Sequence, residues 1–408
     1  MLAARASGLT EIFNISLAED ILSTINALKK LGVRIEILTD KVLVYGIGLK
    51  AFSATQPLEL YMGNSGTSAR LLMGFIASSS IKVIFTGDES LSNRPMERVL
   101  KPLANMGITY EFLSDKQLPC SLIGNSALKT GNYSVSVTSA QVKSSLLFAN
   151  LPCNISINIE ELNNSRDHTE IMFKYYGLNI VYQNGFIQFR GGKEFTIGNY
   201  YVPSDPSSAA FIIALIIFKK ITPLNIKNIC INPTRTGFIK VLQQMGCNID
   251  FENIHYLQGE KVADLKIIPS TLKDINIGPE IFTSMIDEYP IFSVIAAYSN
   301  CKVSMTGLDE LKYKESNRIA LIEQGLISFG YDVSIKNDSL IINKKEKKHK
   351  INIAIKTAGD HRIAMSFIIL AILHDQKIII DNIECINTSF PNFFTILQEL
   401  GINDFKLS

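Results

Sequence analysis

Apolar residues recur with helical spacing along this chain, and each such stretch ends in the same way. A helix is followed by Leu-Gly or a close variant, and then by a short β-rich run, as in "INALKKLGVRIEI" and "VLQQMGCNIDF". A glycine directly after a helix is the usual left-handed C-cap, and the β-branched run after it predicts a strand. Six copies at intervals of 69 to 84 residues indicate internal duplication, and their glycines are Gly32, Gly107, Gly177, Gly246, Gly330 and Gly401.

Six repeats of this length predict an α/β protein with two similar domains of three repeats each. The best boundary is "GNYYVPSDPSSAAF", where Pro203 and Pro206 interrupt regular structure. Asp205 can cap a helix that begins at Pro206, since proline is favoured in the first turn. We therefore expect an N-terminal domain over 1–203 and a C-terminal domain over 204–408, with the ligand site in the cleft between them.

Two long uncharged runs, Ala209–Phe218 and Ile363–Leu373, predict buried helices. Both are shorter than the ~20 residues that a membrane span needs. The start "MLAARASGLTEI" has neither the positive region nor the apolar core of a signal peptide.

Composition excludes several classes of protein. The net charge of +2 is too balanced for a nucleic-acid binder. The six cysteines are scattered without a C-x-x-C pair, so neither a zinc site nor a disulfide framework is indicated. We expect a cytoplasmic protein that is a monomer, with no nucleic-acid or membrane partner.

Arginine is used sparingly here, at 10 residues among the 40 basic ones, and most arginines lie in compact polar stretches. Its planar fork binds phosphate and carboxylate in a bidentate way, which lysine cannot do. A single arginine of this kind is as often a surface ion pair, but the set predicts several anion contacts. Its members are Arg70, Arg94, Arg98, Arg166, Arg235, Arg318 and Arg362.

The stretch "LKYKESNRIALIEQGL" (311–326) reads as an amphipathic helix whose first turns crowd Lys312, Lys314, Glu315 and Arg318 together. Cations at a helix N-terminus oppose the macrodipole, so the arrangement predicts an anionic ligand.

Four other stretches have a polar start before a helix. "GNSGTSARLLMGF" is a glycine turn leading into a helix, whose free N–H groups suit anions, although it lacks the ending of a P-loop. "SVTSAQVKSSLLFA", "SRDHTEIM" and "TAGDHRIAMSF" are similar, and "DEYP" places two carboxylates before an apolar run. No metal site or covalent nucleophile is indicated, and we interpret His168 and His361 as capping or structural residues.

Taken together, these stretches resemble the EPSP synthases (5-enolpyruvylshikimate-3-phosphate synthases), class II in particular. The motifs occur in family order from about residue 1 to the C-terminus. They are "GNSGTSAR", "SNRPMERVLKPL", "TSAQVKSSLL", "SRDHTE", "VPSDPSSAAF", "NPTRTG", "DEYP", "KESNR", "GDHRIAMSF" and "TSFP". The resemblance implies two domains of three βαβαββ repeats, the enolpyruvyl transferase fold or inside-out α/β barrel.

The resemblance also implies the reaction: transfer of the enolpyruvyl group of phosphoenolpyruvate to the 5-hydroxyl of shikimate 3-phosphate, with release of phosphate. It implies no cofactor and no metal. Asp287 would accept the hydroxyl proton, Glu315 would protonate the methylene carbon, and Lys314 would stabilise charge.

The substrate-binding residues follow from the same motifs. Phosphoenolpyruvate would contact Asn64, Gly66, Arg94, Gln141, Arg318 and Arg362. Shikimate 3-phosphate would contact Ser139, Ala140, Gln141, Arg166, Asp287 and Lys314. Gly66 would leave room for the inhibitor glyphosate, since resistant class II members carry alanine at this position.

The chain departs from the family pattern at two places. Asn317 stands where the family usually has Asp, which leaves Arg318 without that ion-pair partner. The family's Pro-Gly-x-Lys-Ser-x-Ser-x-Arg-type motif precedes the segment that Met1–Gly8 resembles. From its absence we expect a chain that folds, with an unpaired sheet edge in the second domain, but is nearly inactive. Two alternatives stay open: an inactive or weakly active relic, and a transferase acting on UDP-N-acetylglucosamine.

Overall fold

The computed structural model describes residues 1–135, 139–219, 225–344 and 353–402, and its chain forms two compact units. Unit 1 consists of Met1–Val202 together with Tyr256–Glu260. Unit 2 consists of Pro203–His255 together with Lys261–Ser408. Each unit has its own core of buried aliphatic and aromatic side chains.

Unit 1 contains three four-stranded sheets, and all three have the same topology. In each sheet an edge strand runs parallel to its neighbour, and the other two strands are antiparallel, in the orders β12-β1-β3-β2, β4-β5-β7-β6 and β8-β9-β11-β10. The strands are β1 (Ser7–Phe13), β2 (Arg34–Ile37), β3 (Lys41–Ile47), β4 (Leu58–Tyr61), β5 (Lys82–Thr86), β6 (Thr109–Phe112), β7 (Cys120–Ile123), β8 (Gly131–Val135), β9 (Ser156–Glu161), β10 (Asn179–Gln183), β11 (Phe186–Arg190) and β12 (Gly198–Tyr201).

Unit 2 repeats this topology in the sheet β16-β17-β19-β18. Its other described sheets are β13-β15-β14 and the parallel pair β20-β21. Ile229 of β13 also forms an isolated parallel bridge with Ser204. The strands are β13 (Asn225–Cys230), β14 (Asn248–Leu257), β15 (Glu260–Ile268), β16 (Ile275–Ile277), β17 (Val303–Met305), β18 (Asp332–Lys336), β19 (Ser339–Asn343), β20 (Ile353–Ile355) and β21 (Ile378–Ile380).

The helices fall into a buried and a partly exposed set. The buried helices of unit 1 are α1 (Leu2–Arg5), α3 (Gly66–Ile76) and α6 (Ala140–Asn150), and those of unit 2 are α8 (Pro206–Lys219), α11 (Tyr289–Tyr298) and α13 (His361–His374). The two long apolar runs lie in α8 and α13, as predicted. The partly exposed helices, each near the end of a repeat, are α2 (Glu19–Lys30), α5 (Glu97–Met106), α7 (His168–Tyr175), α9 (Gly237–Gln244), α12 (Arg318–Ser328) and α14 (Phe393–Glu399).

The predicted helix ends are confirmed at all six repeat glycines, which have φ angles from 73° to 115°. This left-handed conformation is costly for residues with a Cβ, so glycine is the natural cap. A strand follows the first five glycines, at β2, β6, β10, β14 and β18. The run predicted after Gly401 lies outside the described residues.

In unit 1 the last strand of each repeat passes very close to the end of a buried helix. A Cβ on Gly46, Gly124 or Gly191 would lie 2.0, 2.1 or 1.9 Å from a carbonyl oxygen at the end of α1, α3 or α6, respectively. No side chain fits at such a distance, so glycine permits the packing at all three equivalent places. This shared contact is a second sign of the duplication.

The predicted helix start within 311–326 is wrong. Residues Asp309–Tyr313 form a short 3₁₀ helix, and α12 begins only at Arg318, with the side chain of Asn317 accepting a hydrogen bond from Ala320 N. Lys312, Lys314 and Glu315 therefore lie ahead of the helix, not in its first turns. By contrast, Asp205 caps α8 as predicted, accepting hydrogen bonds from the backbone N of Ser207 and Ser208.

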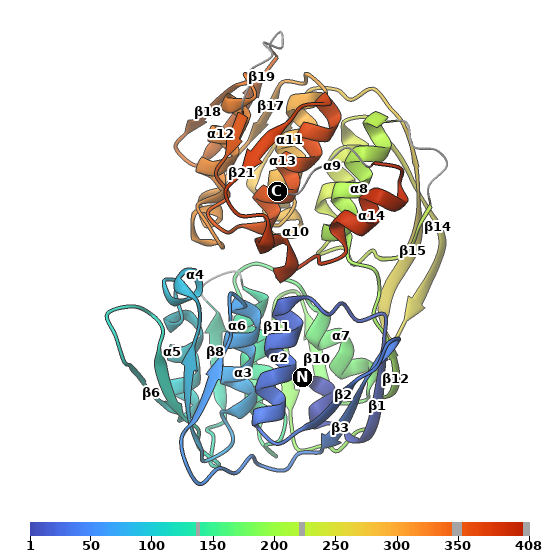
Figure 1. The fold of residues 1–408 in the computed structure, drawn as a ribbon. Helices are drawn as coiled ribbons and strands as arrows, with labels where there is room; N and C mark the ends of the chain where they lie inside the picture. Colours follow the sequence, from blue (N-terminus) through green and yellow to red (C-terminus); the bar gives the residue numbers. More distant parts are fainter. Residues whose placement is uncertain (136–138, 220–224, 345–352, 403–408) are drawn as a thin grey trace. The chain divides into compact units, whose positions relative to one another are not determined.

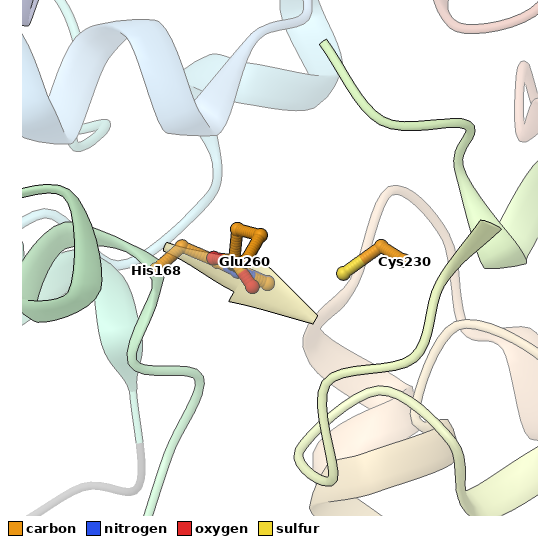
Figure 2. Close-up of side chains that lie close together, drawn as sticks. All are labelled: His168, Cys230 and Glu260. Atoms are coloured by element: carbon orange, nitrogen blue, oxygen red, sulfur yellow. Dashed lines mark hydrogen bonds and ion pairs between the residues drawn. The ribbon is translucent and has the colours of Figure 1, made fainter. Parts of the chain in front are cut away.

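The chain passes between the units at Val202 and again within the hairpin β14–β15 (Figure 1). The tip of this hairpin, Tyr256–Glu260, belongs to unit 1. There the backbone N of Tyr201 donates to Gln258, and His168 at the start of α7 bonds to Glu260 with 2.5 Å between Nδ1 and Oε1 (Figure 2). Cys230, also drawn in Figure 2, belongs to unit 2.

Candidate active site

In unit 1 the predicted phosphoenolpyruvate residues surround the N-terminus of α3. Ser65 caps this helix by accepting a hydrogen bond from Ser68 N. The Asn64 side chain donates to Asp88 at 2.7 Å and accepts from Arg94 Nη2 at 3.2 Å. Arg94 Nη1 also donates to the Asn64 carbonyl at 3.3 Å. The guanidinium of Arg94 is thus fixed beside the first turn of α3.

Gly66, the first residue of α3, leaves room for the guanidinium of Arg94 in this arrangement. A Cβ at this position would lie 2.8 Å from Arg94 Nη1 and 3.3 Å from Arg70 Nη1. A methyl group would therefore displace the guanidinium of Arg94. Sequence reasoning identified Gly66 from the motif, but only the structure shows what fills the space above it.

A short chain of hydrogen bonds joins the N-termini of α3 and α6. Arg70 Nη1 donates to Gln141 Oε1 at 2.6 Å, and Gln141 Nε2 donates to Thr67 Oγ1 at 2.9 Å. Gln141 is in the first turn of α6, after Ser139 and Ala140. Arg70 and Thr67 were not among the predicted site residues, although both lie in "GNSGTSAR".

In unit 2 the predicted residues gather around one buried guanidinium. Arg318, with 1% of its side chain exposed, contacts three carboxylates: Asp360 through Nε at 2.8 Å, Asp287 through Nη1 at 3.2 Å and Glu315 through Nη2 at 2.5 Å. Burial alone would lower the pKa of Arg318, and these three carboxylates reverse that effect and raise it. The expectation that Arg318 lacks an ion-pair partner is therefore wrong.

Asp360 was missed as a partner because it lies 42 residues from Arg318 in the chain. It caps α13 by accepting a hydrogen bond from Arg362 N, and it also accepts one from the Ser316 hydroxyl at 2.9 Å. Burial would raise the pKa of Asp360, but the charge of Arg318 outweighs burial and lowers it. The sign that sequence reasoning passed over is the Asp before His-Arg in "GDHR".

Three cations face the carboxylate of Asp287. Besides Arg318, the Nζ of Lys314 and the Nε of Arg362 each lie 3.8 Å from its Oδ1. Arg362 Nη1 also lies 3.4 Å from the backbone carbonyl of Asp287. Nearby positive charge favours the ionised carboxylate, the form that can accept a proton. Asp287 and Glu315, both bonded to Arg318, thus form a pair of carboxylates suited to proton transfer.

A second network lies at the start of α8. Arg235 Nη2 donates to Asp205 at 2.7 Å and to the Ser207 hydroxyl at 2.8 Å, and Ser207 donates to Glu288. Arg235 is one of the seven arginines that the sequence analysis expects to contact anions. In this structure it holds acidic and hydroxyl groups of unit 2.

His361, the first residue of α13, is buried and lies 3.3 Å from the Thr388 hydroxyl through Nδ1. Burial, together with the charge of Arg362, lowers the pKa of His361 to about 4. The imidazole is therefore neutral at physiological pH, as a structural histidine would be.

Unit 1 also contains a cavity of about 350 Å³, which lies away from the predicted site residues. It is lined by Ser78, Leu128 and Cys153 among others, near the C-terminal ends of α3 and α6. None of the predicted site residues lines it. Within either unit taken by itself, the described residues contain no cluster of three metal-ligating side chains.

Comparison with known proteins assigns the family. The family described as EPSP synthase (3-phosphoshikimate 1-carboxyvinyltransferase) matches residues 1–397. The chain belongs to the EPSP synthase family. A 3-phosphoshikimate 1-carboxyvinyltransferase from Caldicellulosiruptor saccharolyticus is 41% identical over 402 residues, covering 97% of this chain and 92% of that protein. Its counterpart from Bartonella quintana is 37% identical over 407 residues, covering 98% and 92%.

Solved structures agree with this assignment. The EPSP synthase from Acinetobacter baumannii superposes with a TM-score of 0.82 at 36% identity, covering 98% of this chain and 92% of that one. The enolpyruvyl transferase NikO from Streptomyces tendae shares the fold, with a TM-score of 0.76 at 13% identity. The predicted enolpyruvyl transferase fold is therefore confirmed. No described helix is long and apolar enough to cross a membrane.

Proposed function

We propose that this protein transfers the enolpyruvyl group of phosphoenolpyruvate to the 5-hydroxyl of shikimate 3-phosphate and releases phosphate. The reaction belongs to the shikimate pathway, which leads to chorismate and the aromatic amino acids. The observation that carries the proposal is the pair Asp287 and Glu315 on the buried guanidinium of Arg318, within an EPSP synthase chain. Acid, base and cation are all needed to add an alcohol to an enol phosphate.

Phosphoenolpyruvate offers a phosphate and a carboxylate, and arginine forks suit both groups. In unit 1 we assign its binding to Arg94, supported by Asn64 and Gly66, and to Gln141. In unit 2 we assign it to Arg318 and Arg362.

For the phosphate of shikimate 3-phosphate we propose the N-terminus of α6. This helix has 11 residues and begins with Ala140 after Ser139, whose side chain makes no capping bond. Free N–H groups and the helix dipole favour an anion there. Arg166 would add a fork to the same phosphate, while Gln141, Lys314 and Asp287 would bind the ring.

In the chemical step, Asp287 takes the proton of the 5-hydroxyl as the oxygen attacks C2 of phosphoenolpyruvate. Glu315 protonates the methylene carbon, which gives a tetrahedral intermediate. Breaking the bond to phosphate and removing a proton from the new methyl group then restores the double bond. Lys314 stabilises the charge near Asp287, and no cofactor or metal takes part.

Outside the reaction we propose a cytoplasmic monomer whose partners are its two small substrates, without nucleic acid or membrane. None of the six cysteines forms a disulfide in the described chain, which fits a reducing compartment.

The test is an assay of phosphate release and of enolpyruvyl product, with shikimate 3-phosphate or UDP-N-acetylglucosamine as acceptor. We expect product only from the first, and we propose an active enzyme in place of the near inactivity expected from the sequence, because the chain covers 92% of the Caldicellulosiruptor saccharolyticus relative. Glu315→Gln and Asp287→Asn should lower kcat by roughly 10²–10⁴-fold, because each removes a proton-transfer group. The exposed Glu310→Gln is the matched control and should leave kcat unchanged. Product from the UDP sugar, or full activity of both variants, would refute the proposal.

A further inference from the structure

A buried cation in α6 lies between two buried carboxylates. Lys143 has 2% of its side chain exposed, and its Nζ lies 2.8 Å from Glu161 and 2.7 Å from Glu170. The two glutamate side chains are 4% and 1% exposed. We call Lys143, Glu161 and Glu170 the buried triad. The roles assigned above use none of its members.

The buried triad joins four segments of unit 1. Lys143 lies in α6, Glu161 ends β9, and Glu170 lies in α7. The fourth segment is the loop 162–167, in which Ser165 is bonded twice. Its carbonyl accepts from Lys143 Nζ at 3.4 Å, and its hydroxyl donates to Glu161 Oε1 at 2.5 Å.

Members and partners of the triad are close in sequence to residues of the proposed phosphate site. Lys143 follows Gln141 by two residues in the first turns of α6, and Ser165 immediately precedes Arg166. The Ser144 and Thr169 hydroxyls, 2.8 Å apart and both buried, add a second link between α6 and α7. Arg166, which we assign to this phosphate, therefore lies in a loop that the triad holds through Ser165.

Stability alone does not explain this choice of residues. Desolvation often cancels the attraction within a buried ion pair, and apolar replacements of similar volume are often as stable or more so. Here one ammonium faces two carboxylates, and burial raises the pKa of Glu170 despite the charge of Lys143. What ionic hydrogen bonds supply and apolar packing does not is fixed geometry between the segments.

We propose that the buried triad is a positioning device for shikimate 3-phosphate: it holds the loop 162–167 so that Arg166 meets the phosphate at the N-terminus of α6. The proposal rests on the proposed function. Lys143, Glu161 and Glu170 are positioning residues, since they act through Ser165 and Arg166. Phosphoenolpyruvate, assigned to other residues apart from Gln141, should be far less affected by their loss.

The decisive variant is Lys143→Met/Glu161→Leu/Glu170→Leu, which replaces all three charges by apolar side chains and leaves no buried charge unpaired. We expect a folded protein whose Kd for shikimate 3-phosphate, measured by calorimetry, rises by roughly tenfold or more, the effect of losing hydrogen bonds to charged groups. The KM for phosphoenolpyruvate should change by less than about threefold. Glu161→Gln, which keeps an acceptor for Ser165, should restore most of the affinity when compared with Glu161→Leu.

Two controls separate positioning from general damage. Leu122→Ala destabilises the core of unit 1 at a fully buried position in β7, and Lys101→Met removes an exposed ion pair with Glu97. Both should keep the wild-type Kd. If the triple variant binds shikimate 3-phosphate as the wild type does, or if Leu122→Ala raises the Kd equally, the triad has no positioning role and the proposal is wrong.

A substrate-free measurement keeps this outcome distinct from failure of the proposed function. Hydrogen exchange of the amides in 162–167 should be faster in the triple variant than in the wild type, with no ligand present. If the wild type bound no shikimate 3-phosphate, the proposed function would fail, while exchange would still show whether the triad holds the loop. Equal exchange in both proteins would overturn the positioning proposal alone.

Discussion

The arginines of unit 1 and unit 2 that are assigned to phosphoenolpyruvate are held in different ways. Arg94 is oriented by neutral oxygens of Asn64, at 3.2 and 3.3 Å. Arg318 in unit 2 is instead bonded to three carboxylates. A neutral acceptor orients a guanidinium without cancelling its charge, whereas a carboxylate compensates the charge and can also exchange protons.

The difference indicates a division of labour. In the proposed function, unit 1 would present positive charge to the substrate anions, and unit 2 would combine positive charge with the carboxylates assigned to proton transfer. Arg318 compensates acids of its own unit and, in the proposed function, would also contact phosphoenolpyruvate. The following predictions test this contrast.

The largest effect is expected from removing the guanidinium of Arg318. Arg318→Met leaves Asp360, which is fully buried, without its cation, and breaking a buried pair in this way costs about 3–5 kcal/mol. Arg94→Met should weaken phosphoenolpyruvate binding but lower the free energy of unfolding much less. Urea unfolding and KM measured on both variants make the comparison. Equal losses of stability would show that the two arginines do not differ as described.

The next effect concerns stability and pH in unit 2. The pKa of His361 is about 4 in the folded protein and 6.5 as its ordinary value. The unfolded chain therefore binds more protons between these values, so the stability present above pH 6.5 is lost as pH falls toward 4, by up to about 3 kcal/mol. His361→Gln should flatten this part of the stability curve, as measured by urea unfolding from pH 7 to 4. The exposed His255→Gln is the control, and an unchanged slope in His361→Gln would contradict the prediction.

A smaller effect is expected at Gly66 in unit 1. Gly66→Ala places a methyl group 2.8 Å from Arg94 Nη1, so the guanidinium must move. The KM for phosphoenolpyruvate should rise by roughly threefold to tenfold, the effect of a weakened charged hydrogen bond. Stability should be unchanged or slightly higher, because alanine favours a helix over glycine. Glyphosate, which we expect to inhibit the Gly66 protein, should inhibit the variant less.

Gly131→Ala is the matched control for this change, since the nearest atom to a Cβ there lies 3.6 Å away. Its KM should stay at the wild-type value. If Gly66→Ala also keeps the wild-type KM and glyphosate inhibition, Arg94 is not restricted by the space above Gly66.

Local features of this fold were predictable from sequence, because local chemistry determines them. A left-handed residue after a helix favours glycine, so six glycines revealed six repeats, and Asp205 before Pro206 marked the start of α8. The start of α12 is also marked locally, by Asn317 as its cap, but the partners of Arg318, the first residue of this helix, are not local. Arg318 is drawn to Asp287 and Asp360, 31 and 42 residues away in the chain.

The residues of the candidate site also differ in how far the sequence could predict them. Motifs identified the side chains that we assign to the substrates, since these have distinctive chemistry in short stretches. Their partners, such as Asp360 for Arg318 and the members of the buried triad, escaped notice because a partner is defined by a contact in space. Their spacing in the sequence follows no period.

The smallest effect is expected at Asn317, the residue that departs from the family pattern. Asn317→Asp keeps the cap of α12, since Asn and Asp cap helices about equally well. The new charge would gain from the helix dipole and from Arg318 but would be repelled by the three carboxylates already there. These effects oppose one another, so the free energy of unfolding should change by less than about 0.5 kcal/mol and kcat by less than about twofold. Asn317→Ala, which removes the cap, should cost about 1 kcal/mol and shows that the measurement is sensitive. A large gain in stability or kcat for Asn317→Asp would mean that Arg318 is undercompensated in unit 2, and the contrast with Arg94 in unit 1 would then fail.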